Sequence, residues 1–485
     1  MILRVNPSRV VRGLSLAAAL LLLAPGSRAE DTVVSGTLPE DYLPGLKSLV
    51  HAAVKESPTM ILQQIQLAQS EAGLLAGDAS LYPQLSGSVG YGASNESVGV
   101  SGEAGGASSK STGTSKSFTY SVSASQNLFQ WGAVWKQTRI AKLQLLIQQK
   151  SYAEAYRSFV VQLRDLYLGL IMKKLALRNA HFNLKIVEAQ LAISEDQLKS
   201  GMISQGGILG PRLAAEDTRL GVDRIDEDYA HSKRMLAQFA GVPDIDEDTI
   251  PIDVPAVTPA PATGEALLAE FLRDGAKSTF TAENYAMYVK QQQLNYEIAL
   301  VRQLPKFAAY GSYSLSNSTS ISLANPVAGQ APVPAAIAQE AVKSESYGIS
   351  ASVDIFDGFA TTAAMRSAKD SKHYYERTLQ TYLETTMEAA QDARRQVEFS
   401  GRAMKLAETR YDLAKSAFDE AQEDLKLGTI TQAFVDSTTY QLYYSAWARA
   451  SARADFLSHW SAYVSLVDAD PALNELPVHY VRPTR

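Results

Sequence analysis

The sequence predicts a mainly α-helical protein with a membrane β-barrel portion, built from a duplicated unit of helix, β-hairpin and long helical hairpin. Three observations support this fold class. The second half of the chain repeats landmarks of the first half, four short segments alternate between apolar and serine side chains, and two stretches of about 70 residues have helical periodicity.

The N-terminus has the pattern of a secretory signal. Three arginines lie within the first twelve residues, Leu14–Ala24 is an unbroken run of small and apolar residues, and Ser27-Arg28-Ala29 supplies a small-x-small cleavage site. A run of this length is shorter than the roughly 20 residues that span a bilayer as a helix. Residues 1–29 are therefore expected to be a cleaved signal peptide, with an uncleaved anchor as the alternative.

The bulk composition excludes several kinds of site. The chain has no cysteine, which excludes disulfides, thiolate metal sites and a lipoprotein-type anchor. Removal of residues 1–29 takes away four arginines and no acids, so 41 basic and 51 acidic residues remain, a net charge of −10. This balance argues against broad nucleic-acid binding, which requires basic patches.

The duplication is visible at constant offsets. Residues 425–431 (LKLGTIT) repeat residues 198–204 (LKSGMIS) at an offset of 227, and Phe356 follows Phe129 at the same offset. Pro305 and Tyr313 follow Pro83 and Tyr91 at an offset of 222, so the five-residue difference falls in the intervening loops. The interpretation is a first repeat at 30–241 and a second at 264–468.

Each repeat contains a pair of segments with a period of two. The expected strands are about 84–94, 117–128, 306–316 and 346–356, joined by long loops at 94–116 and 317–345. One face of each is apolar with aromatics, the other is rich in serine, and this alternation is typical of outer-membrane barrels. Two soluble hairpins are the alternative. Four strands do not close a barrel alone, so they require partner protomers.

The remaining expected elements are helices and two irregular segments. Each repeat begins with a helix, at 44–80 and 264–303, which a proline ends. Long helices follow the strands, and their 3-4 apolar spacing predicts antiparallel coiled coils with return helices, through turns at Gly201 and Gly428. The expected ranges are about 132–200 and 358–427 for the long helices, 212–239 and 432–467 for the return helices, 242–263 for a Pro-rich acidic linker or strap, and 469–485 for an irregular tail.

This order of elements resembles the TolC-like outer-membrane efflux proteins, the outer membrane factor family. The resemblance covers essentially the whole mature chain and is most specific at residues 428–431 (GTIT) and at the turns after Phe129 and Phe356. It implies a homotrimer whose strands form one 12-stranded barrel in the outer membrane, continued into the periplasm by an α-helical coiled-coil barrel. It also implies that the shorter helices, 45–80 and 212–239, stack end to end along the long one.

The function that the resemblance implies is an exit duct of a tripartite efflux or type I secretion system. Solutes would pass passively from the complex of a periplasmic adaptor, or membrane fusion protein, and an inner-membrane pump. The lipid of the outer membrane would be a further partner, and nucleic acid would not. The expected adaptor contacts are the tip turns Gly201, Ile203, Ser204, Gly428, Ile430 and Thr431.

The entrance departs from the family pattern. Acidic residues are expected six and nine positions after the tip glycine, but Phe434 and Ser437 occupy these positions, and Asp436 is the nearby acid. The first tip is also longer and looser, with three glycines and Pro211 before Arg212. Phe434, Asp436 and Arg212 are therefore the candidate gate residues, and the hypothesis is a gate narrowed by Phe434 rather than by charge.

No pattern for catalysis, for a metal site or for a cofactor is recognisable. The six histidines are scattered, with no pair at i, i+4 spacing, and no nucleophile elbow is present. An enzyme is therefore not expected. The alternative to a duct is a non-conducting periplasmic coiled-coil protein with a structural or tethering role, which would not need lipid-facing alternation.

Overall fold

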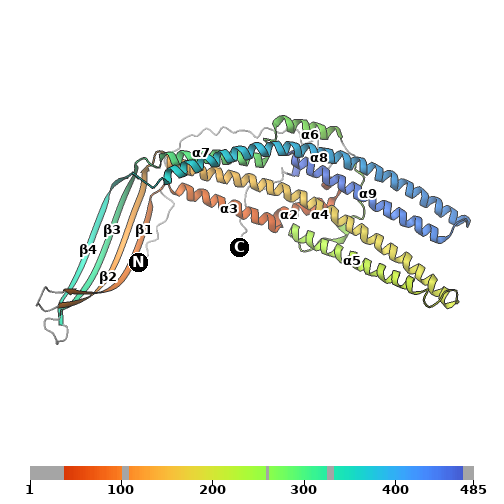
Figure 1. Ribbon diagram of the computed structural model, residues 1–485, viewed down its shortest axis with the longest axis horizontal. Helices are drawn as coiled ribbons and strands as arrows, with labels where there is room; N and C mark the ends of the chain where they lie inside the picture. Colours follow the sequence, from red (N-terminus) through yellow and green to blue (C-terminus); the bar gives the residue numbers. More distant parts are fainter. Residues whose placement is uncertain (1–37, 101–108, 258–260, 325–332, 473–485) are drawn as a thin grey trace, which may run out of the picture.

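The computed structural model describes residues 38–100, 109–257, 261–324 and 333–472. The predicted signal peptide and all but the first four residues of the predicted C-terminal tail lie outside these ranges. The molecule is elongated and arched, with four strands at one end and two helical hairpin tips at the other (Figure 1).

The strands form one antiparallel sheet in the order β1-β2-β3-β4. Their bounds are β1 Gln84–Val100, β2 Ser109–Phe129, β3 Lys306–Ala324 and β4 Val333–Ser352. The expectation of short strands joined by long loops was wrong, because the β1–β2 ladder continues through Ser94↔Ser115 to Val100↔Ser109. Apolar alternation stops near the middle of each hairpin, but backbone pairing requires no apolar side chains and continues into the Ser, Gly and Thr segments.

Strand β4 also ends earlier than residue 356. Its last residue, Ser352, pairs with Lys306, the first residue of β3. The residue before Lys306 is Pro305, which has no N–H to donate to a further rung of the ladder.

The helices lie side by side in a curved layer that continues from the sheet (Figure 1). Near the tips the lateral order is α8, α9, α4, α5, and nearer the sheet it is α8, α7, α4, α3. The bounds of these helices are α3 Pro58–Ala79, α4 Ala133–Lys199, α5 Leu209–Ala240, α7 Phe280–Val301, α8 Ala360–Leu427 and α9 Gln432–Leu466. With 67 and 68 residues, α4 and α8 are each roughly 100 Å long.

Among the described residues, no helix combines the length and the apolar character needed to cross a membrane.

Each predicted opening helix is in fact two helices. The first divides into α2 (Pro44–Glu56) and α3, because Pro58 forces Ser57 into an extended conformation with φ −62° and ψ 129°. The second divides into α6 (Pro261–Asp274) and α7, separated by Gly275 and Ala276, which both have positive φ. A four-residue helix, α1 (Pro39–Tyr42), precedes α2.

The short helices α5 and α3 stack end to end along α4, as the resemblance implied, except that α2 is not part of this stack. The C-terminus of α5 meets the break between α2 and α3, where the Ser57 hydroxyl donates to the Phe239 carbonyl at 2.8 Å. Gly241 ends α5 with φ +78°, and its α-carbon faces the Glu56 carbonyl so closely that a Cβ would overlap it. The junction therefore requires glycine for two independent reasons.

The segment between the repeats is a strap rather than a free linker. Its described part, residues 242–257, contains the 3₁₀ turn η1 (Glu247–Thr249) and buries Ile245, Ile250 and Val254 in the main core, and the predicted end at residue 263 was too late because α6 begins at Pro261. Lys174 of α4 donates to the carbonyls of Glu247 and Ile250, both at 2.8 Å. Arg453 of α9 donates to the carbonyl of Val254 at 2.9 Å. The strap is thus bound to both α4 and α9.

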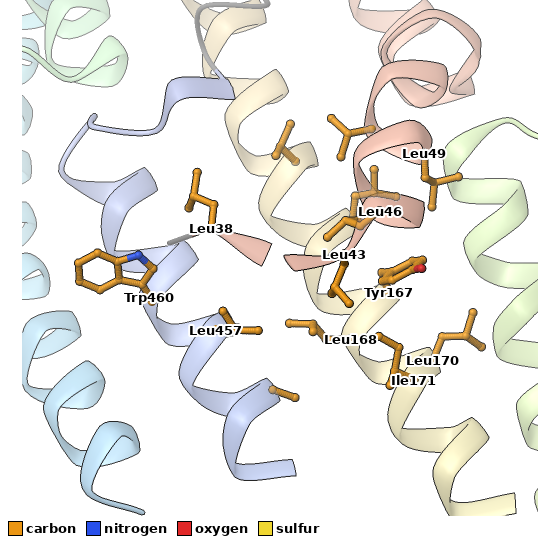
Figure 2. Close-up of a cluster of buried hydrophobic side chains, with 14 of the residues drawn as sticks. Leu38, Leu43, Leu46, Leu49, Tyr167, Leu168, Leu170, Ile171, Leu457 and Trp460 are labelled. Carbon is orange, nitrogen blue, oxygen red and sulfur yellow. The ribbon is translucent and has the colours of Figure 1, made fainter. Parts of the chain in front are cut away.

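The main core lies at mid-length, where the N-terminal segment enters the helical layer. Figure 2 shows Leu38 and Leu43 in the space between α4 and α9, next to Tyr167 and Leu457. All four side chains are buried. Apolar burial is therefore concentrated where both repeats, the strap and both ends of the described chain meet.

A buried arginine lies at the centre of this region. The fully buried Arg164 donates to Glu40 at 2.6 Å, to Ser461 at 2.8 Å and to both carboxylate oxygens of Asp470 at 2.5 and 3.1 Å. Burial alone would lower the pKa of Arg164, but the charges of Asp470 and Glu40 raise it above its ordinary value. Removal of one partner from such a buried network costs about 3–5 kcal/mol.

We predict that Gly241→Ala destabilises the protein. The left-handed backbone costs a non-glycine residue about 1–3 kcal/mol, and the contact with the Glu56 carbonyl adds to that cost. The matched control is Gly221→Ala, also in α5, where a Cβ would meet nothing within 4 Å and the helix gains about 0.5–1 kcal/mol. Thermal unfolding of the purified proteins followed by circular dichroism measures both, and an equal midpoint for the two variants would contradict the prediction.

Candidate functional site

The two faces of the sheet differ in polarity, and the strand register places each residue on one of them. Paired residues of antiparallel strands share a face, so the rows Val89↔Tyr120↔Leu315 and Leu85↔Ala124 belong to one apolar face. The predicted apolar alternation is therefore present across strands β1 to β3. Tyr347 and Ile349 continue this face on β4 and are largely exposed.

The opposite face is a ladder of hydroxyl groups. Cross-strand contacts join Ser86 with Ser123 at 2.7 Å, Ser88 with Ser121 at 2.7 Å and Ser312 with Ser346 at 2.8 Å. On this face of the described sheet, no acidic or basic residue lies between the level of Lys306, at the helix end, and that of Glu340. The surface is therefore wettable but carries no charge over these rows.

The strands pass into the long helices through two tight turns of the same kind. Trp131 and Gly132 are consecutive residues with positive φ, and so are Gly358 and Phe359 at the offset of 227. Trp131 donates its indole N–H to the Pro305 carbonyl at 2.9 Å, so this turn is bonded to the start of β3. The rings of Phe129 and Trp131 pack edge to face at 5.1 Å.

The two tip turns at the far end have identical hydrogen bonds at an offset of 227. Met202 N–H donates to the Gln197 carbonyl at 2.8 Å, and Thr429 N–H donates to the Asp424 carbonyl at 3.0 Å. The preceding glycines, Gly201 and Gly428, are left-handed, with φ near +75°. Each long helix therefore ends in a Schellman motif, which requires the glycine that the sequence predicted at this position.

Beyond these glycines the two tips differ. In the second tip α9 begins at Gln432, four residues after Gly428, whereas α5 begins only at Leu209, eight residues after Gly201. Helix α5 still begins three residues before the expected start at Arg212, because Pro211 lies in the first turn, where helical N–H groups have no intrahelical partner.

In each tip turn one of the predicted contact residues is half-buried and the next is exposed. Ile203 and Ile430 are half-buried, while Ser204 and Thr431 are exposed. Ser204 accepts from the Gly207 N–H through both its hydroxyl and its carbonyl. Buried apolar residues below each turn, Ile208 and Val435, were missed from the sequence, although the offset of 227 relates them too.

The structure does not bring the three candidate gate residues together. Phe434 is 54% exposed and Asp436 accepts from Gln432 at 2.9 Å, both within the second tip. Arg212 lies in the first tip, where it pairs with Glu195 at 3.6 Å. Within residues 38–257 and 333–472, no recorded ion pair joins the two tips. The residue related to Phe434 by the offset of 227 is Gly207, so the large aromatic ring is present in one tip and absent in the other.

The described part of the chain contains no cluster of three or more His, Asp or Glu side chains arranged to hold a metal ion.

The architecture is shared with solved bacterial outer-membrane channels. The structure of the CmeC channel of Campylobacter jejuni superposes with a TM-score of 0.64 at 14% identity and covers 89% of this chain and 87% of its own. VceC of Vibrio cholerae gives 0.57 at 15% identity over 88% and 97%, and the open state of MtrE of Neisseria gonorrhoeae gives 0.57 at 13% identity over 90% and 91%. A comparison with curated proteins gave no match.

The sequence itself matches the family described as outer membrane efflux protein over residues 49–242. This match covers about two fifths of the 485-residue chain. The family match supports an outer-membrane efflux protein, and the solved channels share its fold. The predicted fold class, a barrel-type sheet continued by a helical coiled-coil portion, is confirmed by this fold.

We predict that adjacent residues of β2 differ in access to water. The chain has no cysteine, so single-cysteine variants can be labelled without background. In liposomes, Ser121→Cys on the serine face is expected to react with a charged, membrane-impermeant thiol reagent at least about tenfold faster than Val122→Cys on the apolar face. Equal rates, or the reverse order, would show that the faces are assigned wrongly.

Proposed function

We propose that this efflux channel works as a homotrimer, a passive exit duct without enzymatic activity. Three four-stranded sheets would close one 12-stranded barrel in the outer membrane, and three helical layers would close a coiled-coil barrel in the periplasm. The observation that carries the proposal is that one chain has two open edges along its whole length. One edge consists of β4 and α8, and the other of β1, α3 and α5.

The strand edges require a partner inside a membrane. Strands β1 and β4 each pair with a neighbour on one side only, so their outer N–H and C=O groups have no partner within the chain's sheet. Unpaired backbone groups cost several kcal/mol each in hydrocarbon. Pairing of β4 with β1 of the next copy removes both edges when the ring closes.

The two helical edges both expose apolar side chains at a spacing of seven residues. Helix α8 exposes Phe399, Leu406 and Leu413 at spacings of seven residues, the last of them 67% exposed. Helix α5 on the opposite edge exposes Leu213 and Leu220, also seven residues apart. A seven-residue apolar spacing on both edges suits coiled-coil packing between copies. Since the two edges differ, the contact is head-to-tail and generates a ring.

The periplasmic partners would be an adaptor protein and an inner-membrane pump, of either a tripartite efflux or a type I secretion system. The two tips would contact the adaptor through Gly201, Ile203, Ser204, Gly428, Ile430 and Thr431. The acidic residues of the two tips differ in their ion pairing, which favours unequal contacts with the adaptor. Acids of the first tip are paired internally, as in Arg219–Glu188 at 2.7 Å, whereas no ion pair is recorded for Glu420 or Glu423 among the described residues of the second.

The entrance would be narrowed by Phe434, with Asp436 of the same tip and Arg212 of the other tip nearby once the ring has closed. An apolar constriction opposes conduction because water leaves it easily. Opening would require the tips to move apart, driven by binding of the partners. The duct then needs no group that performs chemistry.

The proposal is tested by the mass of the purified protein in detergent together with single-channel recording in planar bilayers. A trimer with discrete conductance steps is expected. A folded monomer or dimer without conductance would overturn the duct and favour the non-conducting tether, which the family does not support.

We predict that Phe434→Ala raises the single-channel conductance on the order of twofold, because removal of the ring widens the constriction and makes it easier to wet. Met202→Ala is the control, since Met202 is an exposed apolar residue of the first tip; its conductance is expected to equal that of the wild type. Unchanged conductance in the Phe434 variant would place the constriction elsewhere.

A further inference from the structure

A depression of about 350 Å³ lies on the outward, apolar face of the sheet. Its lining combines two aromatic rings, one lysine and several small polar side chains. These residues are Tyr91, Thr114, Lys116, Ser117, Phe118, Asn317 and Thr319.

The register places all of the lining residues except Ser117 on one face, in three neighbouring rows, the third of which contains Thr114. Tyr91, Phe118 and Asn317 form one row, and Lys116 and Thr319 lie in the next row, further from the helices. All of these residues come from β1, β2 and β3 of a single chain. The depression is therefore complete without a second copy.

The depression lies where the apolar run of β2 ends, whereas on β4 the ion pair Lys343–Glu345 lies on the same face in rows nearer the helices. On β2 this face extends from Phe129, beside the helices, to Phe118, and the next residue on the same face is Lys116. Eleven residues at about 3.3 Å each, on a strand tilted by about 45°, give a height of roughly 25 Å, which is the height of the apolar band of outer-membrane proteins. The aromatic rings therefore lie at the outer edge of the hydrocarbon, and Lys116 lies at headgroup level.

Lys116 differs in its ion pairing from Lys343, the other lysine nearby on this face. Lys343 of β4 pairs with Glu345 at 2.7 Å and lies over the ring of Tyr313. For Lys116, no ion pair is recorded within residues 38–100, 109–257, 261–324 and 333–472. An ammonium group at the hydrocarbon boundary gains from a counter-charge, and within the described ranges no carboxylate supplies one to Lys116.

We propose that the depression binds the phosphate group of an acylated lipid in the outer leaflet. Lys116 provides the charge for the phosphate, Thr319 and Asn317 provide further hydrogen-bond donors, and the rings of Tyr91 and Phe118 pack against the first part of an acyl chain. The inference rests on the proposed function only for the orientation of the sheet in the membrane. One such lipid is expected for each chain.

Native mass spectrometry of the purified full-length protein tests the site with three probes. Dioleoylphosphatidic acid has the phosphate and the acyl chains, dioleoylglycerol has the acyl chains alone, and inorganic phosphate has the anion alone. Wild type is expected to retain one phosphatidic acid per chain in preference to dioleoylglycerol. Lys116→Gln is expected to lower this retention about tenfold, because one charge-assisted hydrogen bond is lost.

Two variants are the matched controls. Lys116→Arg keeps the charge and is expected to retain the lipid, and Lys343→Gln removes the paired lysine and is expected to behave as wild type. Equal loss in Lys116→Gln and Lys343→Gln, or loss in neither, would overturn the site. Full displacement of the lipid by millimolar inorganic phosphate would also overturn it, since the rings would then contribute nothing.

The outcome is separable from that of the proposed function. Lys116→Gln is expected to conduct as wild type does, since its side chain lies on the face away from the serine ladder. A wild-type protein that retains the lipid but does not conduct would contradict the duct alone. A conducting protein without lipid preference would contradict this inference alone.

Discussion

Hydrocarbon does not tolerate unpaired backbone hydrogen-bonding groups, and the organisation of this molecule follows from that constraint. Four strands in one chain leave β1 and β4 with open edges. The long helices continue the sheet, so the same two edges extend through α8 on one side and through α3 and α5 on the other. In the proposed trimer, the strand edges that have to be paired in the membrane are continued by packing surfaces along roughly 100 Å of helix.

The duplication conserves geometry more strictly than chemistry. The two tip turns have the same pair of backbone hydrogen bonds, and the two strand–helix turns have the same pair of left-handed residues. The side chains have diverged, since Gly207 occupies the place of Phe434. Backbone requirements at a turn are met by few residues, whereas an exposed tip position is open to change. One fold therefore has two tips with different surfaces.

The long helices, their coiled-coil partners and the tip glycines were predictable because each depends on local periodicity or on a single backbone requirement. The strand lengths were not predictable, because segments rich in Ser, Thr and Gly are compatible both with a β-ladder and with a loop. The break at Ser57 had a visible signal in Pro58. The partners of Arg164 had none, since Glu40 and Asp470 are separated by 430 positions and only the folded chain brings them together. The contacts between the two tips also could not be predicted, because they depend on neighbouring copies of the chain.

The position of Arg164 has a consequence for the order of folding. Its two carboxylate partners come from near the beginning and near the end of the described chain. In any delivery of the chain that begins at its N-terminus, α4 arrives long before Asp470, and its arginine has to remain solvated until then. The centre of the bundle therefore stays open until the last helix has emerged. Chains that terminate early would keep an exposed, unsatisfied core, which proteases can recognise and remove.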